Sequence, residues 1–169
     1  FLKHRVSDLE HSVTGGNFVW KDGTIAGKHQ GYPFYTIGQR KGLGVAFGKP
    51  VFVTEIIPET NTVILGDEAD LDRQLMWVGK LNLQKYDHLP EGMEVVTKIR
   101  YKDKGTLSHL YHESDQLRIE FYQPAKGVAP GQSAVFFEGE DVIGGGIIQR
   151  YPVGKDVPSR AGVLTKAVL

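Results

Sequence analysis

The 169-residue chain carries 20 Lys plus Arg and 20 Asp plus Glu, and this balance excludes any argument from net charge for a polyanionic partner. It contains no cysteine, which excludes disulfides, cysteine zinc ligands and thiol catalysis within these residues. No apolar run approaches the roughly 20 residues that cross a bilayer, and no signal-peptide core is present, so we expect a cytoplasmic protein without membrane contact. Because the chain begins with Phe1, we also expect it to be a fragment of a longer protein.

Residues 1–74 are predicted to form a small central α+β domain. Apolar positions 2, 6 and 9 are typical of a short helical turn or of the end of a helix. Asp22-Gly23, between two apolar runs, predicts a hairpin with a type I′ turn, and residues 51–66 predict a second hairpin around the turn sequence PETN. Between the hairpins, residues 32–40 predict a short helix with Pro33 in its first turn.

Residues 75–152 are predicted to form a six-stranded antiparallel β-barrel, so that the chain as a whole is mainly β. The turn sequences LPEG, KDKG, ESDQ, APGQ and EGED separate runs of strand length. The glycines at 144–146 predict a bulge or a barrel corner within the last run. Residues 153–169 lack clear periodicity and are expected to be a mobile tail. The six predicted strands are 76–83, 94–101, 106–111, 116–122, 133–137 and 142–149.

Neither the histidines nor the glycine-rich segments indicate a metal or nucleotide site. His109 and His112 lie three apart on a predicted strand, so their side chains are expected on opposite faces. The glycines at 42–48 and 144–150 lack the Walker pattern, and residues 14–17 lack the Asp and Ser of the pyrophosphate-binding loop found in ATP pyrophosphatases. No nucleophile has an adjacent base. We therefore expect no catalytic residue, metal or cofactor within the chain.

Four basic residues alternate along the predicted strand 94–101 and just beyond it. A period of two places such residues on one face of a strand, about 6.6 Å apart, which suits the phosphates of an extended nucleic-acid strand. Tyr101 could stack on a base or pack inward. These residues alone leave two interpretations open, a phosphate-binding face or a solvated barrel face whose lysines discourage edge pairing. The four are Lys98, Arg100, Lys102 and Lys104.

The segment GKHQGYPFYTIGQRKGLGVAFGKP, residues 27–50, combines six glycines with polar donors. Glycines let another backbone approach closely, and the donors suit phosphates and base edges. From this chemistry the chain is interpreted as a binding module of two small domains rather than a self-sufficient catalyst. The donors are His29, Gln30, Gln39, Arg40 and Lys41.

The same segment, with GKHQG followed by YTIGQRKGLG, resembles the tRNA-specific 2-thiouridylase (MnmA) family. The resemblance continues through PVFVTEIIPETNTVILGD, the strand that ends in Arg100-Tyr101, and VAPGQSAVFFEGEDVIGGGII. It covers about residues 1–152. It implies that residues 1–74 are the central domain of such an enzyme and residues 75–152 its C-terminal β-barrel.

What the family does is implied for the parent protein only. In the family, an N-terminal ATP-pyrophosphatase domain uses ATP with Mg to adenylate the wobble uridine of tRNA. A persulfide on a cysteine then displaces AMP and leaves 2-thiouridine. This chain has neither the pyrophosphate loop nor a cysteine. The resemblance therefore implies a fragment that is inactive alone, from a transferase whose partners are tRNA and a persulfide sulfur donor protein.

The resemblance also assigns candidate residues. Arg100-Tyr101 and Gln132 match tRNA-contact positions of the family, and Lys98 and Lys102 flank the first of these. The alternative is a β-barrel module for protein interaction or structural support without its own tRNA contact. Barrels of this kind also occur in translation factors and aminomethyltransferases, so the fold does not decide the function. Residues implied to dock on the absent domain, or to lie beside its active site, are His29, Gln39, Arg40 and Lys41.

Overall fold

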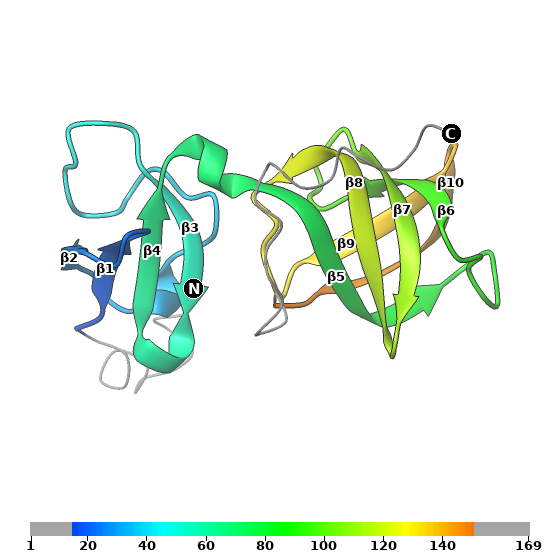
Figure 1. Ribbon diagram of the computed structural model, residues 1–169, viewed down its shortest axis with the longest axis horizontal. Coiled ribbons are helices and arrows are strands. Elements are labelled where there is room, and N and C mark those ends of the chain that lie inside the picture. The colour runs from blue at the N-terminus through cyan, green and yellow to red at the C-terminus, as the bar shows by residue number, and fades with distance from the viewer. Residues whose placement is uncertain (1–14, 151–169) are drawn as a thin grey trace, which may run out of the picture. The chain divides into compact units, whose positions relative to one another are not determined.

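A computed structural model describes residues 15–150, and the mainly β class predicted from the sequence is confirmed (Figure 1). The chain divides into two compact units. The first ends at Asp72 and takes in Lys126–Ala129, and the second comprises Arg73–Ala125 and continues from Pro130. The domain limits proposed at residues 74 and 152 stay predictions. The helical turn expected over residues 2–9 and the tail expected over residues 153–169 lie outside the described residues.

The first unit is built on a four-stranded mixed sheet with the strand order β2-β1-β4-β3. Both predicted hairpins are present, but the pairing that joins them is parallel, between β1 and β4, with Phe18 opposite Val63. Phe18, Val63 and Leu65 are fully buried there because the two central strands carry the core of this unit. The strands are β1 (Asn17–Trp20), β2 (Ile25–Lys28), β3 (Phe52–Ile57) and β4 (Thr62–Gly66).

The turn of the first hairpin differs from the type I′ turn that was expected. Gly23 has a positive φ of 90°, but Asp22 does not have the positive φ that a type I′ turn requires. Instead, the Asp22 carboxylate accepts hydrogen bonds from the backbone N–H and the hydroxyl of Thr24, at 2.9 and 2.7 Å. These hydrogen bonds lower the pKa of Asp22. Asp22 thus acts as a turn cap in the manner of an Asx turn.

The short helix predicted over residues 32–40 is wrong beyond its first turn. Only η1, Tyr32–Phe34, is helical, and it is a 3-10 turn. Tyr35 already has extended backbone angles, and its side chain is buried against Phe18. Gly38 then donates to the Val53 carbonyl at 2.8 Å, so this segment pairs with the edge of the sheet and leaves the helical path. The other 3-10 turns are η2, Pro58–Thr60, and η3, Glu68–Leu71.

The second unit is a closed six-stranded antiparallel barrel with the order β10-β5-β8-β7-β6-β9, as predicted. Alternate side chains point inward and fill the interior, among them Leu110, Ile119 and Phe136, each no more than 1% exposed. Within residues 15–150, no helix has the length and apolar character needed to cross a membrane. The strands are β5 (Asp72–Leu83), β6 (Met93–Lys98), β7 (Thr106–Glu113), β8 (Gln116–Lys126), β9 (Ser133–Glu138) and β10 (Asp141–Ile148).

The bulge predicted at the three consecutive glycines of β10 is confirmed. The register of β10 shifts between Val142 and Gly144 against β9, and between Gly145 and Ile147 against β5. A Cβ added to Gly146 would lie 2.5 Å from the backbone oxygen of Gly79. Glycine is required here because two barrel strands approach more closely than a side chain allows.

Gly146→Ala is expected to lower the stability of the barrel by about 1–3 kcal/mol, because the backbone of β5 must move to accommodate the methyl group. Thermal unfolding followed by circular dichroism measures the change. Gly139→Asn is the control, since Gly139 lies in a turn with a φ of 60° and open space around it, which Asn tolerates. Equal melting temperatures for Gly146→Ala and the parent chain would contradict the assignment.

Candidate nucleic-acid interface

Antiparallel pairing brings three separate segments to one end of the barrel. Lys98, at the end of β6, lies opposite Val135 near the start of β9. The end of β10 lies beside the same segment, because Gly131 N–H donates to the Ile148 carbonyl and Ile148 N–H donates to the Gln132 carbonyl, both at 2.8 Å. Residues 99–105, 130–132 and 149–150 therefore share one end of the barrel, which we call the basic rim.

The basic residues of the rim do not form the single strand face that was predicted. β6 ends at Lys98, and residues 99–105 form a turn. The two carboxylate oxygens of Asp103 accept hydrogen bonds from the N–H groups of Ile99 and Gly105, at 3.1 and 3.0 Å. The Asp103 carboxylate thus binds backbone N–H groups that, in an extended strand, would donate to the carbonyl groups of a neighbouring strand. The expected row of four cations on a strand is therefore wrong.

The turn presents an aromatic ring between two cations. Tyr101 is 100% exposed, and Arg100 and Lys102 beside it are also exposed. Lys98 behaves differently, because its ammonium lies 4.6 Å from the ring centroid of Phe137 on the barrel wall. A fully solvated tyrosine makes no contribution to the core, so its ring is available for stacking on a base.

Gln132 lies on the same rim as Arg100 and Tyr101, although 31 positions separate Gln132 from Tyr101 in the numbering. Its side chain is exposed and follows Gly131, whose φ is 87°. Arg150, which the sequence reasoning missed, is also exposed, two residues after the end of β10. The available signal was the turn sequence EGED between the predicted strands 133–137 and 142–149, which pair as a hairpin in the structure. In a hairpin, the residue before the first strand and the residue after the second strand share one end.

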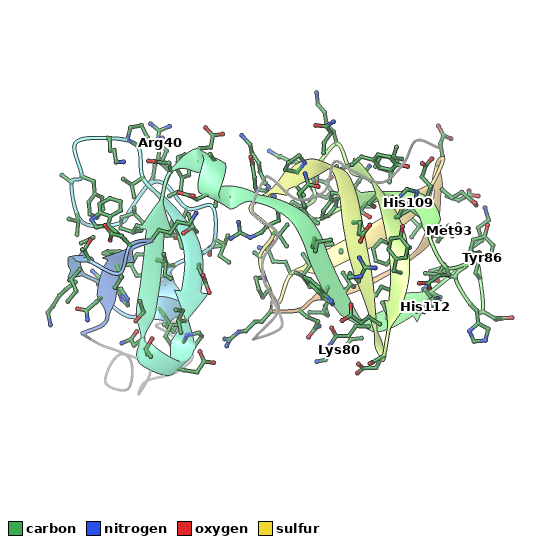
Figure 2. All side chains as sticks on the ribbon, viewed as in Figure 1. Arg40, Lys80, Tyr86, Met93, His109 and His112 are labelled. Carbon is green, nitrogen blue, oxygen red and sulfur yellow. The ribbon has the colours of Figure 1, made fainter. Side chains whose placement is uncertain are left out.

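The opposite end of the barrel is acidic. Lys85 donates to Asp141 and Glu138 at 2.8 and 2.6 Å, and these two hydrogen bonds raise the pKa of Lys85. Tyr86, in the same segment (Figure 2), donates to Glu138 at 2.9 Å. The charges of the barrel are thus separated along the strand direction, and the basic rim is electrostatically the more favourable of the two ends for a polyanion. Acidic residues of this end are Glu91, Glu113, Asp115, Glu138, Glu140 and Asp141.

The residues proposed to dock on another domain have different environments in the first unit. Gln39 is used within its own loop, where its amide oxygen accepts from Thr36 N–H and its amide nitrogen donates to the Lys41 carbonyl, both at 3.0 Å. Arg40 and Lys41 are exposed on the turn that Gln39 closes. Gln39 therefore positions the two cations, and the docking role of all three stays a prediction.

His29 lies in the core of the first unit, with 6% of its surface exposed. Its ring contacts Phe18 and Tyr35 edge to face, and its Nδ1 accepts a 2.9 Å hydrogen bond from Gly31 N–H. A Cβ on Gly16 would overlap the imidazole, so glycine is needed at that position. Because the side chain is buried, His29 anchors the start of the segment instead of offering a surface.

Within residues 15–150, no three His, Cys, Asp or Glu side chains are placed to hold a metal ion. His109 and His112 both come from β7 (Figure 2) but have separate partners. The Nε2 atom of His109 lies 3.1 Å from the Tyr122 hydroxyl, whereas that of His112 lies 2.8 Å from the Leu89 carbonyl.

Two family models match this chain. The model described as the tRNA methyl transferase PRC-barrel domain matches residues 1–67, and the aminomethyltransferase beta-barrel domain matches residues 73–148. The tRNA-specific 2-thiouridylase MnmA of Cytophaga hutchinsonii is 55% identical over 151 residues, which are 88% of this chain and 41% of that protein. The chain belongs to the MnmA family.

Other MnmA proteins show the same coverage. Those of Amoebophilus asiaticus and Salinibacter ruber are 51% and 47% identical over 88% of this chain, and the matches cover 40% and 39% of the relatives. The chain thus spans about 40% of the length of the curated relatives it matches. It corresponds to the middle and C-terminal domains of MnmA, as the resemblance in the sequence implied.

His29 is expected to titrate below its ordinary pKa of 6.5, because burial disfavours the charged ring while the Asn61 backbone partly opposes this shift. The unfolded chain then binds the proton first, so the stability of the first unit should fall as the pH drops below about 6.5. The NMR resonance of the His29 Cε1 proton measures the pKa directly. A midpoint at or above 6.5 would show that the imidazole is not held in its neutral form.

Proposed function

We propose that this chain is the tRNA-binding part of a tRNA-uridine 2-sulfurtransferase, which converts the wobble uridine of tRNA to 2-thiouridine with ATP and persulfide sulfur. The named activity of the relatives supports the reaction class. One structural observation carries the binding role. The turn that holds Arg100, Tyr101 and Lys102 lies at the same end of the barrel as Gln132 and Arg150.

Each part of the basic rim suits a different element of RNA. The guanidinium groups of Arg100 and Arg150 match phosphate oxygens in a planar, paired geometry. The solvated ring of Tyr101 can stack on an unpaired base, and the exposed amide of Gln132 can both donate to and accept from a base edge or a 2′-hydroxyl. Because the far end of the barrel is acidic, electrostatic steering directs an RNA toward this rim.

The activation and sulfur-transfer steps belong to the rest of the parent enzyme. The residues here do not fit ATP, since Gly16 packs against His29 and the sequence at 14–17 lacks the Asp and Ser of a pyrophosphate loop. Adenylation with ATP and Mg, and the cysteines that receive persulfide sulfur from a donor protein, are assigned to an N-terminal domain. What this chain contributes is the binding and orientation of tRNA.

The double variant Arg100→Ala/Lys102→Ala is expected to weaken tRNA binding about tenfold or more and to reduce the slope of log K against log salt by about two, one for each lost phosphate contact. Filter-binding titrations between about 50 and 200 mM salt give both the affinity and its salt dependence. Lys80→Asn removes a cation in the middle of β5 and serves as the control. Unchanged affinity and slope in the double variant would remove the rim from the interface.

The chain by itself is expected to be catalytically inactive. Incubated with ATP, tRNA and a persulfide source, it should release no AMP and form no 2-thiouridine, because it has no cysteine to carry sulfur. Mass spectrometry of the tRNA nucleosides measures the product. Thiolation by the purified chain would refute the division of chemistry between domains.

One observation favours the alternative, a protein-interaction module. Four outward apolar side chains lie side by side across β7, β6, β9 and β10, because Val96 is opposite both Leu107 and Phe137, and Phe137 is opposite Val142. Leu107 and Val142 are 40% and 46% exposed. Rows of this kind occur at protein interfaces. A tRNA affinity that falls with rising salt and is weakened by Arg100→Ala supports the RNA role. A tRNA affinity that changes with neither salt nor Arg100→Ala supports the alternative.

A further inference from the structure

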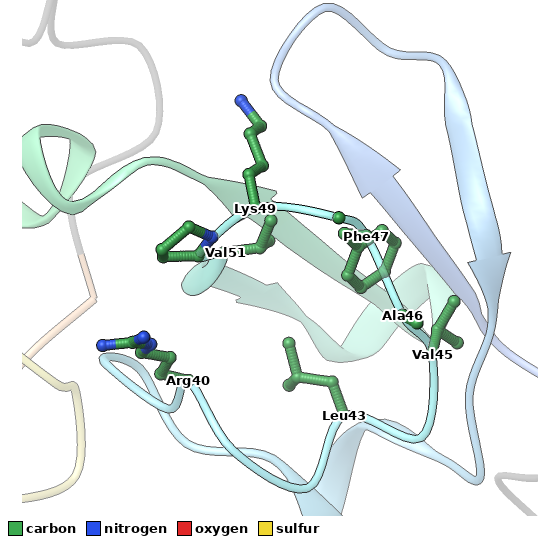
Figure 3. Close-up of a pocket in the computed structure, with 9 residues that line it drawn as sticks. Arg40, Leu43, Val45, Ala46, Phe47, Lys49 and Val51 are labelled. Atoms are coloured by element: carbon green, nitrogen blue, oxygen red, sulfur yellow. The ribbon is translucent and has the colours of Figure 1, made fainter.

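The glycine-rich loop of the first unit borders an open pocket of about 360 Å³. Figure 3 shows Leu43 and Phe47 directed toward the hollow within the loop, with Arg40 at its edge. This volume is at the lower end of the range for small-molecule sites, about 300–1,000 Å³. The residues that line the pocket are Arg40, Leu43, Val45, Ala46, Phe47, Gly48, Lys49, Pro50 and Val51.

The apolar floor of the pocket is held in place by the core of the first unit. Leu43 and Val51 are 6% and 3% exposed and belong to the core of the unit. The ring of Phe47 is fixed edge to face against Trp20, with centroids 5.3 Å apart. Hydrogen bonds between Gly38 and Val53, and between Val53 and Gln39, hold the start of the loop on the sheet. Little ordering cost remains for a ligand that enters.

The charges around the pocket leave Arg40 without an ion pair. Each acid at η3 already has its own lysine: Asp67 pairs with Lys49 at 3.1 Å, Asp70 with Lys21 at 2.8 Å, and Glu68 with Lys126 at 2.8 Å. Lys126 is the main cause of the lowered pKa of Glu68, and Arg40 contributes less. Among the described residues, Arg40 forms no ion pair or hydrogen bond. The Arg40 guanidinium at the pocket edge is therefore available to pair with the anionic group of a ligand.

We propose that this pocket binds one unstacked nucleotide of an RNA, with the base against Leu43, Phe47 and Val51 and its phosphate at Arg40. An aromatic and aliphatic wall beside a single guanidinium matches a planar base attached to a phosphate. The inference rests on the proposed function, since that function supplies the RNA. The pocket belongs to a different unit of the chain from the basic rim, so experiments can disprove either proposal without affecting the other.

The two tryptophans of the chain report on the two units separately. Trp20 contacts Phe47 in the pocket wall, whereas Trp77 is buried in the barrel with its indole N–H bonded to Glu113 at 3.1 Å. In a ¹⁵N–¹H spectrum of the 169-residue chain, nucleoside 5′-monophosphates should shift the indole signal of Trp20 in a saturable way. The indole signal of Trp77 should stay in place.

Three variants test the role of Arg40. Arg40→Ala should weaken mononucleotide binding about tenfold or more, and Arg40→Lys should restore only part of it, because a lysine cannot pair with two phosphate oxygens at once. Lys41→Ala is the matched control, since it removes the neighbouring exposed cation, which does not line the pocket. Equal losses in Arg40→Ala and Lys41→Ala would overturn the pocket in favour of general charge attraction.

Further probes identify the source and class of the ligand. A single-stranded RNA tetramer that binds at least as tightly as the mononucleotide supports an RNA nucleotide, and binding of the mononucleotide alone overturns that source. Shifts of Trp20 by inorganic phosphate with equal affinity, or by an acidic apolar peptide but not by nucleotides, also overturn the proposal. Loss of tRNA binding in Arg100→Ala/Lys102→Ala with intact mononucleotide binding tests the basic rim independently of the pocket.

Discussion

Closure of the barrel is the constraint on which the candidate interface depends. When six antiparallel strands close, every turn is assigned to one end or the other, and the register of each pair fixes which residues meet there. Lys98 opposite Val135, and Ile147 opposite Ser133, place the turn at residues 99–105 beside Gln132 and the end of β10. Side chains that are far apart in the chain thus form one rim. The acidic turns are necessarily placed at the other end.

The turns themselves decide what the rim presents to solvent. Asp103 satisfies two backbone N–H groups, and this ends the extended path of β6 after Lys98. The same turn holds Tyr101 in solvent between two cations, whereas Lys98 remains against Phe137 on the wall. A carboxylate in a basic segment therefore has a structural use: it shapes the loop while the surrounding cations stay exposed.

The first unit shows a comparable division between anchoring and exposed residues. His29 and Gln39 were both grouped with Arg40 and Lys41 from the sequence, as donors in one glycine-rich segment. In the structure, His29 packs in the core and Gln39 closes its own loop, whereas the side chains of Arg40 and Lys41 stay exposed and form no such contact within the loop. Sequence alone does not separate these roles, because imidazole and amide groups can form hydrogen bonds either within the fold or with a ligand at the surface.

Local and periodic features of this protein were readable from its sequence alone. The six barrel strands, the two hairpins and the bulge at Gly144–Gly146 follow from side-chain alternation and from turn residues, which act over a few positions. The family could be inferred from motifs because they are contiguous. Only the tertiary structure decided the parallel pairing of β1 with β4, the loss of the helix after Phe34, the turn at Asp103 and the position of Arg150 on the rim. The parallel pairing, the loss of the helix and the position of Arg150 depend on contacts between segments distant in sequence, whose packing and hydrogen bonding override local preference. The Asp103 turn is local, but a carboxylate that bonds to backbone N–H groups cannot be told from an exposed one by alternation alone.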